Sequence, residues 1–222
     1  PELEKHQYEY IYFRTENSWT MRGAFYGAQV IFGELGYDKE NLDAYREYVF
    51  GTFEGNLLLE ALKKYTTDEI KKDIENMEQE PFHIYINGSN PNREELTLEN
   101  KEEHLQTLKR QTIQFNDSGS YAVIGSDYAH SIVEGRGKGK KKGNLLLITD
   151  TRGKMMISYL SEIFEKVYVS NISKDADLTQ DLDEILEKYD IEYIIWAQDV
   201  AEIGNSFYMK ALNPLLKEGG NG

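Results

Sequence analysis

The stretch from Leu145 to Leu160 constrains the fold most, because a continuous apolar run there gives way to a polar turn and then to helical spacing. The run from Leu145 to Thr149 is short and almost wholly apolar, which predicts a buried strand. Apolar residues recur at helical intervals after Gly153. The sequence therefore predicts a strand, a turn and a helix, with Asp150 and Thr151 at the carboxyl end of a central strand.

Asp150 and Thr151 occupy the position at which open α/β sheets bind ligands and carry reactive groups. Free N–H groups at the start of the following helix favour an anion there, and the Thr151 hydroxyl would face the same crevice. The alternative is that Asp150 only caps the helix, which suits its type and place. On these two residues alone we favour the cap.

The remaining C-terminal third continues the alternation of strand and helix. We expect strands over Val167–Ser170 and Ile191–Ala197, an amphipathic helix over Thr179–Tyr189 and a last helix over Phe207–Leu216. Such alternation is typical of a parallel sheet with right-handed crossovers. The predicted class is α/β, with a mostly parallel central sheet.

The first half of the chain carries further patterns, with Asn17 or Ser18 as the expected cap of its first helix. Residues 63–114 are expected to form an irregular insertion or variable region within one domain over 1–222. The expected strands are Tyr8–Phe13, Phe82–Ile86 and Ser120–Gly125. The expected helical segments are Met21–Leu35, Asn41–Tyr48, Leu57–Met77 with a break near Thr66–Thr67, and His104–Leu108. The expected loops are Val49–Gly55, Ser126–Ser131 and Gly135–Asn144.

Composition excludes several classes of function. Lys plus Arg is 25 and Asp plus Glu is 39, so the net charge is −14, which repels nucleic acid and anionic lipid. The chain has no cysteine and only four scattered histidines, so we expect no metal site and no cofactor. We recognise no signal peptide or spanning segment, and an anchor upstream of this sequence is left open. The 16 tyrosines offer amphipathic surface suited to polar ligands such as sugars.

Two segments together resemble the DHHW family of SGNH-hydrolase-like proteins, which is related to the alginate O-acetyltransferase proteins and to the D-alanyl transfer protein of teichoic acid synthesis. The first is Tyr12 to Tyr26, where the family has Tyr, a basic residue, Thr, Asp-His-His-Trp-Thr, then Gly-Ala and an aromatic residue. The second is Gly143 to Val169, where the family has a strand, Asp-Ser and a helix. The resemblance implies a three-layer SGNH-like fold from about Tyr8 to Leu216.

In such enzymes a serine attacks an ester, a histidine takes its proton, and an aspartate two residues before the histidine orients it. The resemblance places these roles on Thr151, Ser18 and Glu16, and all three residue types differ. The serine at position 18 matters most, because a hydroxyl cannot accept a proton near neutral pH. The resemblance therefore implies a retained scaffold that has lost its catalytic residues.

A relocated base is the alternative. Asp127 and His130 have the Asp-x-x-His spacing of other SGNH hydrolases, and His130 could serve Thr151. The motif lies at the wrong place in the chain for that role, and an exposed loop histidine is the simpler interpretation.

The leading hypothesis is a catalytically degenerate protein outside the cytoplasm that binds a cell-surface glycan or a cell-envelope partner protein. The former active-site crevice would do this with Asn17, Trp19, Asp150 and Arg152 as binding residues, beside Glu16, Ser18 and Thr151. The first alternative is an O-acyl esterase or O-acetyltransferase of cell-surface polysaccharide, with Thr151 as nucleophile. The second is a structural or assembly module without a ligand.

Overall fold

A computed structural model describes the chain in twelve segments, and its internal contacts divide the chain into two compact units. The first unit is Pro1–Asn92 with Gln114–Tyr121, and the second is Arg93–Ile113 with Ala122–Gly222. The sequence predicts a single domain over 1–222. Whether the two units form one domain is not decided by this division, so the single domain stays a prediction. The described segments are 1–53, 55–64, 67–75, 80–87, 98–99, 105–108, 113–115, 121–123, 130–135, 141–150, 152–172 and 185–199.

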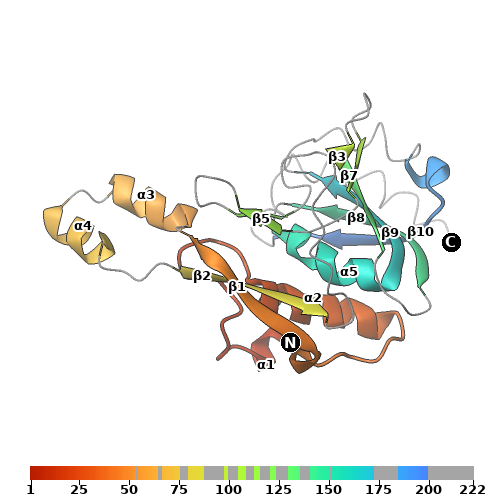
Figure 1. Cartoon of the computed structure of the whole chain (residues 1–222), viewed down its shortest axis with the longest axis horizontal. Helices are drawn as coiled ribbons and strands as arrows, with labels where there is room; N and C mark the ends of the chain where they lie inside the picture. Colours follow the sequence, from red (N-terminus) through yellow and green to blue (C-terminus); the bar gives the residue numbers. More distant parts are fainter. Residues whose placement is uncertain are drawn as a thin grey trace. The chain divides into compact units, whose positions relative to one another are not determined.

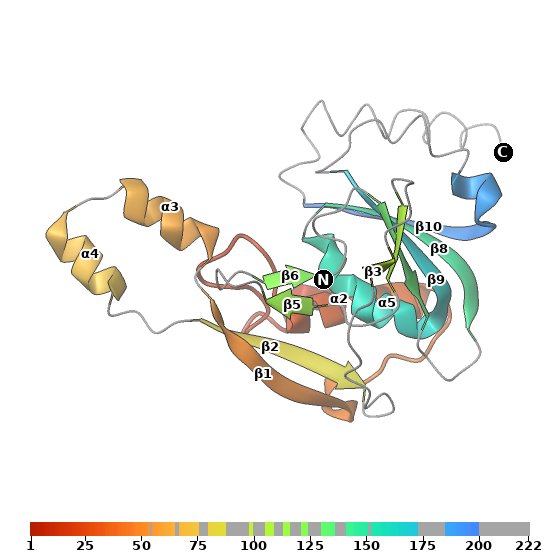
Figure 2. The ribbon, with the colours of Figure 1, turned by 45° about the horizontal axis from the view of Figure 1, so that its top comes forward.

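The first unit combines helices with a two-stranded antiparallel sheet (Figure 1). The sheet pairs β1 with β2, in register from Tyr45 opposite Asn87 to Phe53 opposite Glu80. Figure 2 shows α3 and α4 following one another beyond the end of β1. The elements are α1 (Glu2–Lys5), α2 (Met21–Glu34), the short 3-10 helix η1 (Leu42–Ala44), β1 (Tyr45–Phe53), α3 (Asn56–Lys64), α4 (Asp68–Glu75) and β2 (Glu80–Asn87).

Helix α2 confirms the expected apolar stripe, with Ala24, Phe25, Ala28 and Phe32 buried. Its cap differs from the prediction, however, because the Thr20 hydroxyl accepts the Gly23 N–H at 3.3 Å, in place of Asn17 or Ser18. Gly36 has a φ of +77°, which ends the helix as expected.

The predictions for Asn41–Tyr48 and Val49–Gly55 were wrong, because only the 3-10 helix η1 is helical in the first segment, and β1 forms its second half and most of the second segment. Charged residues there are compatible with an exposed helix, but the ladder to β2 decides the structure. The Tyr45 ring is buried edge-on against Phe25, with 5.2 Å between ring centroids.

The expected strand over Tyr8–Phe13 is also wrong, since only one bridge forms, between Tyr12 and Trp19. The alternation of side chains behind that prediction is nevertheless present as an alternation of burial. Ile11 and Phe13 are buried, whereas Tyr12 between them is exposed. The segment is therefore two-sided without belonging to a sheet.

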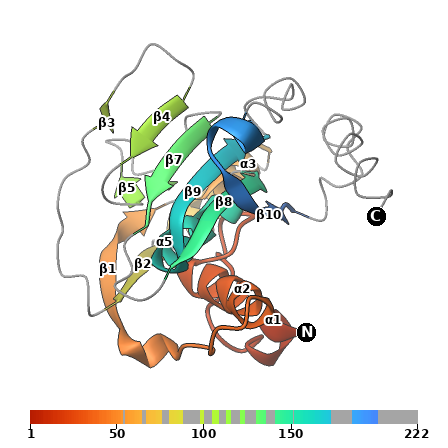
Figure 3. The same ribbon diagram turned by 90° about the vertical axis from the view of Figure 1, so that its right-hand side faces the viewer.

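The second unit contains a six-stranded mixed sheet in the order β10-β8-β9-β7-β4-β3. Figure 3 shows these strands side by side. Three of its five strand pairs are parallel, namely β10 with β8, β8 with β9, and β4 with β7. The strands are β3 (Leu98–Glu99), β4 (Leu105–Leu108), β7 (His130–Glu134), β8 (Lys142–Thr149), β9 (Phe164–Asn171) and β10 (Ile191–Ala197).

Strand β8 lies inside this sheet and is buried along its second half, as the apolar run predicts. Leu146 and Ile148 pack with Tyr168 and Ile185 in one core cluster. After β8 the chain forms the 3-10 helix η2 (Gly153–Met156) and then α5 (Ile157–Ile163), which contacts β9 and β7. The predicted strand, turn and helix are thus confirmed.

The remaining predictions divide between corrections and residues outside the description. The helix expected over His104–Leu108 is wrong, because Leu105–Leu108 is strand β4, parallel to β7. Strands β5 (Ile113–Phe115) and β6 (Tyr121–Val123) form a separate pair. The helix expected over Phe207–Leu216 and residues 179–184 of the preceding helix lie outside the described residues. The α/β class is confirmed, and the three-layer SGNH arrangement stays a prediction.

Candidate functional site

The family-like residues of the first unit lie in a short loop closed by backbone hydrogen bonds, which we call the motif loop (Phe13–Ser18). Phe13 N–H donates to Ser18 O at 3.1 Å, and Thr20 N–H donates to Ile11 O at 2.9 Å. These bonds and the bridge between Tyr12 and Trp19 form its neck. The motif loop therefore begins and ends at fixed points just before α2.

The buried carboxylate of Glu80, the first residue of β2, bonds to the N-terminal half of the motif loop. Glu80 accepts the Arg14 N–H at 2.5 Å and the Thr15 N–H at 2.9 Å. It also accepts the hydroxyls of Tyr10 and Thr15. Burial alone would raise the pKa of the Glu80 carboxyl, but these hydrogen bonds lower it. The ionised carboxylate thus stabilises the course of the loop.

Thr15 connects this loop to α3. Its hydroxyl accepts the Gly55 N–H at 3.1 Å, and its carbonyl accepts the Leu57 N–H at 3.0 Å. Leu57 lies in the first turn of α3, where N–H groups have no partner within the helix. A Cβ at Gly55 would overlap the Thr15 carbonyl, so the chain passes closer there than any side chain allows.

The predicted site residues at the tip differ in environment. Asn17 is exposed, Glu16 and Trp19 are half-buried, and Ser18 is buried, with 8% of its surface exposed. The Ser18 hydroxyl donates to the Trp19 carbonyl at 3.3 Å, and a Glu16 carboxylate oxygen accepts the Asn17 N–H at 3.1 Å. Position 18 therefore holds a buried hydroxyl that donates to the backbone carbonyl of the next residue.

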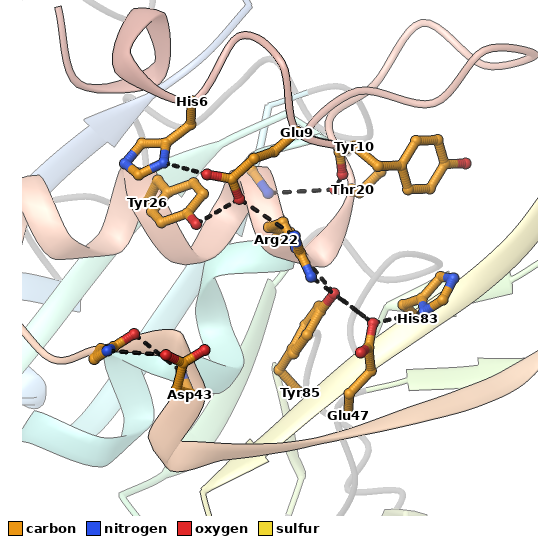
Figure 4. Close-up of polar contacts among 12 residues, drawn as sticks. His6, Glu9, Tyr10, Thr20, Arg22, Tyr26, Asp43, Glu47, His83 and Tyr85 are labelled. Atoms are coloured by element: carbon orange, nitrogen blue, oxygen red, sulfur yellow. Dashed lines mark hydrogen bonds and ion pairs between the residues drawn. The ribbon is translucent and has the colours of Figure 1, made fainter.

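A network of charged and phenolic side chains joins the N-terminal segment, α2, β1 and β2 of the first unit (Figure 4). Glu9 accepts the Tyr26 hydroxyl at 2.7 Å, contacts His6 Nδ1 at 2.6 Å, and accepts from Arg22 at 3.3 Å. Arg22 also donates to the Tyr85 hydroxyl at 3.1 Å. Arg22 thereby joins α2 to both the N-terminal segment and β2.

The network continues into β1. The Tyr85 hydroxyl donates to Glu47 at 2.8 Å, and His83 Nδ1 lies 2.8 Å from the same oxygen. Burial and the hydrogen bond to Glu47 raise the pKa of Tyr85 to about 12. That hydrogen bond, together with His83, also lowers the pKa of Glu47 against the effect of burial. The Glu47 carboxylate is therefore ionised at neutral pH and paired within the network.

In the second unit, Asp150 organises the turn after β8. One of its oxygens accepts the N–H groups of Arg152 and Gly153 at 2.8 and 3.0 Å, and the other accepts the Asp199 N–H at 2.9 Å. Asp150 is buried, and its carboxylate is occupied by three backbone donors. Asp150 thus bonds to the N–H groups at the start of η2, as expected of a capping residue, although the cap position itself is Arg152; it also holds the segment after β10.

Arg152 completes this turn by pairing with Asp199 at 2.7 Å, and its guanidinium lies 3.9 Å from Asp150. The Thr149 hydroxyl donates to the Ala197 carbonyl at 2.6 Å, which joins the carboxyl ends of β8 and β10. A Cβ at Gly153 would overlap the Thr149 hydroxyl, so only glycine allows this close approach. Lys154, the next residue, is fully buried in η2.

The predicted residues thus fall into two groups. Glu16, Asn17, Ser18 and Trp19 lie together in the first unit, and Asp150 and Arg152 lie together in the second. Thr151 lies outside the described residues, so the single crevice expected from the sequence stays a prediction.

The relocated base stays a prediction as well. His130 is the first residue of strand β7, which corrects its placement in a loop, and its side chain lies outside the description, as does Asp127. Among the described residues, no three His, Asp or Glu side chains form a group that could hold a metal ion. The described helices are all too short or too polar to cross a membrane.

Sequence reasoning missed Glu80 and Asp199. Glu80 lies more than 60 positions from its partners in the chain, and Asp199 lies 49 positions from Asp150. No local spacing indicates either contact. The only sequence signal for this region was the family-like segment itself. Within it Thr15 bonds to Glu80, Thr20 caps α2 and Gly23 lies against Ile11.

Comparison with known proteins identifies solved structures with a similar fold. The chain is similar to a DHHW family protein from Eubacterium siraeum, with 17% identity and a TM-score of 0.61, covering 96% of this chain and 66% of that one. It is also similar to Bacillus cereus PatB1, solved alone and with a sulfonyl adduct. Identity to PatB1 is 12%, with TM-scores of 0.53 and 0.55, and 91% of this chain is covered.

The chain thus spans just under two thirds of the length of the E. siraeum protein and 65–67% of PatB1. Identities this low establish the fold alone. No curated protein matches this chain. The family model described as DHHW protein matches residues 2–170 of the 222. The chain therefore belongs to the DHHW family.

Proposed function

We propose that this chain is a DHHW family member without triad chemistry, acting outside the cytoplasm and binding a cell-surface glycan through its motif loop. One observation carries the proposal. The motif loop is held at Thr15 by Glu80 and is followed by the Thr20 cap of α2, whereas the resemblance places Ser18 where the family has its histidine.

The chemistry of position 18 supports the loss of activity. A serine hydroxyl that is sheltered and bonded to the Trp19 carbonyl has no capacity to accept a proton near neutral pH. Removing one triad member commonly costs several orders of magnitude in rate. The exposed Asn17 at the loop tip offers both a donor and an acceptor to a polyol ligand.

An ester assay tests the loss of activity. We expect turnover of 4-methylumbelliferyl acetate by the native chain to equal that of Thr151→Ala. We also expect no covalent adduct in intact-mass spectra after treatment with phenylmethylsulfonyl fluoride. Turnover or labelling that Thr151→Ala abolishes would reject this part of the proposal.

A glycan array tests the binding role. We expect binding of one or more bacterial surface glycans, and we expect Asn17→Ala to weaken it about tenfold, as for a side chain at the centre of a contact. Asp38→Ala, which changes an exposed polar residue elsewhere in the same unit, is the matched control. An array with no binding would favour a structural or assembly module instead.

The second candidate is O-acyl transfer with Thr151 as nucleophile, and buried Lys154 favours it. Thr151 and Lys154 have the Ser-x-x-Lys spacing of enzymes whose lysine lies one turn after the nucleophile. In such a step the Thr151 oxygen would attack the ester carbonyl and its proton would pass to the uncharged Lys154 amine. The lysine would then give that proton to the departing alcohol oxygen as its bond to the carbonyl carbon breaks, and an acceptor hydroxyl or water would release the acyl group from Thr151. The sulfonyl adduct of PatB1 shows that a protein of this fold accepts a covalent modification. Activity lost in both Thr151→Ala and Lys154→Met would support this candidate.

A further inference from the structure

We propose that the cleft between α1 and the segment Gln7–Arg14 binds an uncharged oligosaccharide, at a site separate from the tip of the motif loop. The cleft has a volume of about 610 Å³, within the usual range of small-ligand sites. It lies wholly within the first unit. Its lining includes Glu4, Gln7, Tyr8, Tyr10, Tyr12 and Arg14.

Two tyrosines of the lining are unusually exposed. Tyr8 has 94% of its surface accessible and Tyr12 has 53%, while Ile11 and Phe13 between and beside them are buried. A tyrosine ring combines a broad apolar face with a polar rim, so it suits a partner that is itself part apolar and part polar. A pyranose ring has this character, with C–H groups on its faces and hydroxyls around its edge.

The charges of the lining favour a neutral ligand. Glu4 and Glu9 carry negative charge, and the Arg14 guanidinium lies 5.6 Å from the centre of the Tyr10 ring. Glu9 already contacts Arg22 and His6, so its charge is largely compensated. Glu4 and the net charge of −14 would repel a polyanion, and the positive charge of Arg14 would repel a cation.

The cleft is held in shape before any ligand binds. The Tyr10 hydroxyl donates to Glu80, and the Ile11 carbonyl accepts the Thr20 N–H at the start of α2. Ile11 N–H donates to the Glu9 carbonyl at 2.8 Å. A wall fixed by these bonds loses little conformational entropy on binding, which favours measurable affinity for a polar ligand.

The lining residue Tyr12 also forms a backbone bridge with Trp19 at the neck of the motif loop, so this end of the cleft lies next to the loop. A sugar chain lying over Tyr8 and Tyr12 would therefore extend along the loop. This geometry predicts a preference for several linked sugars over a single one. The inference does not depend on the motif loop itself binding a ligand.

The test measures binding of cellotetraose, maltotetraose and chitotetraose by calorimetry and by saturation-transfer NMR. We expect at least one tetrasaccharide to bind more tightly than its monosaccharide. The double variant Tyr8→Ala/Tyr12→Ala should weaken binding about tenfold or more, whereas Tyr12→Phe, which keeps the ring face, should bind within about threefold of the native chain. Val30→Ala removes exposed apolar surface from α2 and should change nothing.

Three results would overturn the inference. They are no binding of any tetrasaccharide, binding unaffected by the double tyrosine variant in a chain whose circular dichroism shows it folded, and tighter tyrosine-dependent binding of choline or tetragalacturonate. If Asn17→Ala weakens array binding while the double tyrosine variant does not, the proposed function stands and this inference fails. The converse result would support the cleft and count against the loop.

Discussion

At the scale of single residues, Glu80 has the clearest structural role in the described part of the chain. It is buried and accepts two backbone N–H groups and two hydroxyls from three residues of the N-terminal segment. Because a buried donor without a partner costs about 1–3 kcal/mol, the loss of this acceptor affects several groups together.

We therefore expect Glu80→Ala to lower the free energy of unfolding by about 2–4 kcal/mol, and Glu80→Gln, which keeps one carbonyl acceptor, to lower it by less. Urea denaturation at pH 7 measures both. Glu34→Gln changes an exposed carboxylate at the end of α2 and should stay within about 0.5 kcal/mol of the native chain. Equal stability of Glu80→Ala and the native chain would contradict this role.

The same residue predicts a pH dependence. The pKa of Glu80 is lower in the folded chain than the ordinary glutamate value of about 4.3, so its stabilisation is complete above that value. It is lost as the pH falls through the folded-state pKa, because the unfolded chain binds the proton first. The difference in unfolding free energy between the native chain and Glu80→Gln should thus shrink between pH 5 and pH 3. A constant difference would show that the charge of Glu80 has no part in it.

The sequence could not identify this residue. Glu80 precedes a proline in a polar stretch, and its partners are contributed by a segment near the N-terminus. Asp150 is the contrasting case, because two of its three donors lie within three residues and a capping role is predictable from the turn itself.

At the scale of elements, the start of α2 lies unusually close to the segment before the motif loop. A Cβ at Gly23 would overlap the Ile11 carbonyl and lie 3.0 Å from the Trp19 Cβ. Gly33, near the end of the same helix, is exposed, and a Cβ there would meet only the Lys39 side chain at 3.9 Å.

These two glycines make a matched pair. In an open helical position, alanine is more stable than glycine by up to about 1 kcal/mol, so Gly33→Ala should raise the melting temperature. Gly23→Ala should lower it, because forcing an extra methyl group into a filled space typically costs about 1–3 kcal/mol. Differential scanning calorimetry of both variants decides the matter. A stabilised Gly23→Ala would mean that α2 can move away from Ile11.

The success of the sequence predictions also differs by element. The α2 stripe is long and strongly patterned, the β8 run is short but continuously apolar, and both were predicted correctly. Strand β1 contains Arg46 and Glu47 on a surface that also suits a helix, and only its pairing with β2 makes it a strand. Strand β4 is four residues long and is defined by its parallel partner β7.

At the scale of the whole chain, the net charge of −14 is the dominant property. Like charges repel more in the compact state than in the unfolded chain, and salt screens this repulsion. We expect the melting temperature to rise by a few degrees when NaCl increases from about 20 to about 300 mM at pH 7. Potassium chloride should act equally, since screening depends on ionic strength. A fall in melting temperature would show that ion pairs such as those of Arg22 outweigh the repulsion.

The backbone contacts of the motif loop have a consequence for how this family diversifies. Glu80 accepts the backbone N–H groups of Arg14 and Thr15 and makes no such bond to the described positions 16 to 18. Substitutions at those three positions should therefore change the side chains at the loop tip while the path of the backbone is preserved. Under the proposed loss of triad chemistry, a lineage would need only a handful of nucleotide changes and no ancestor that fails to fold.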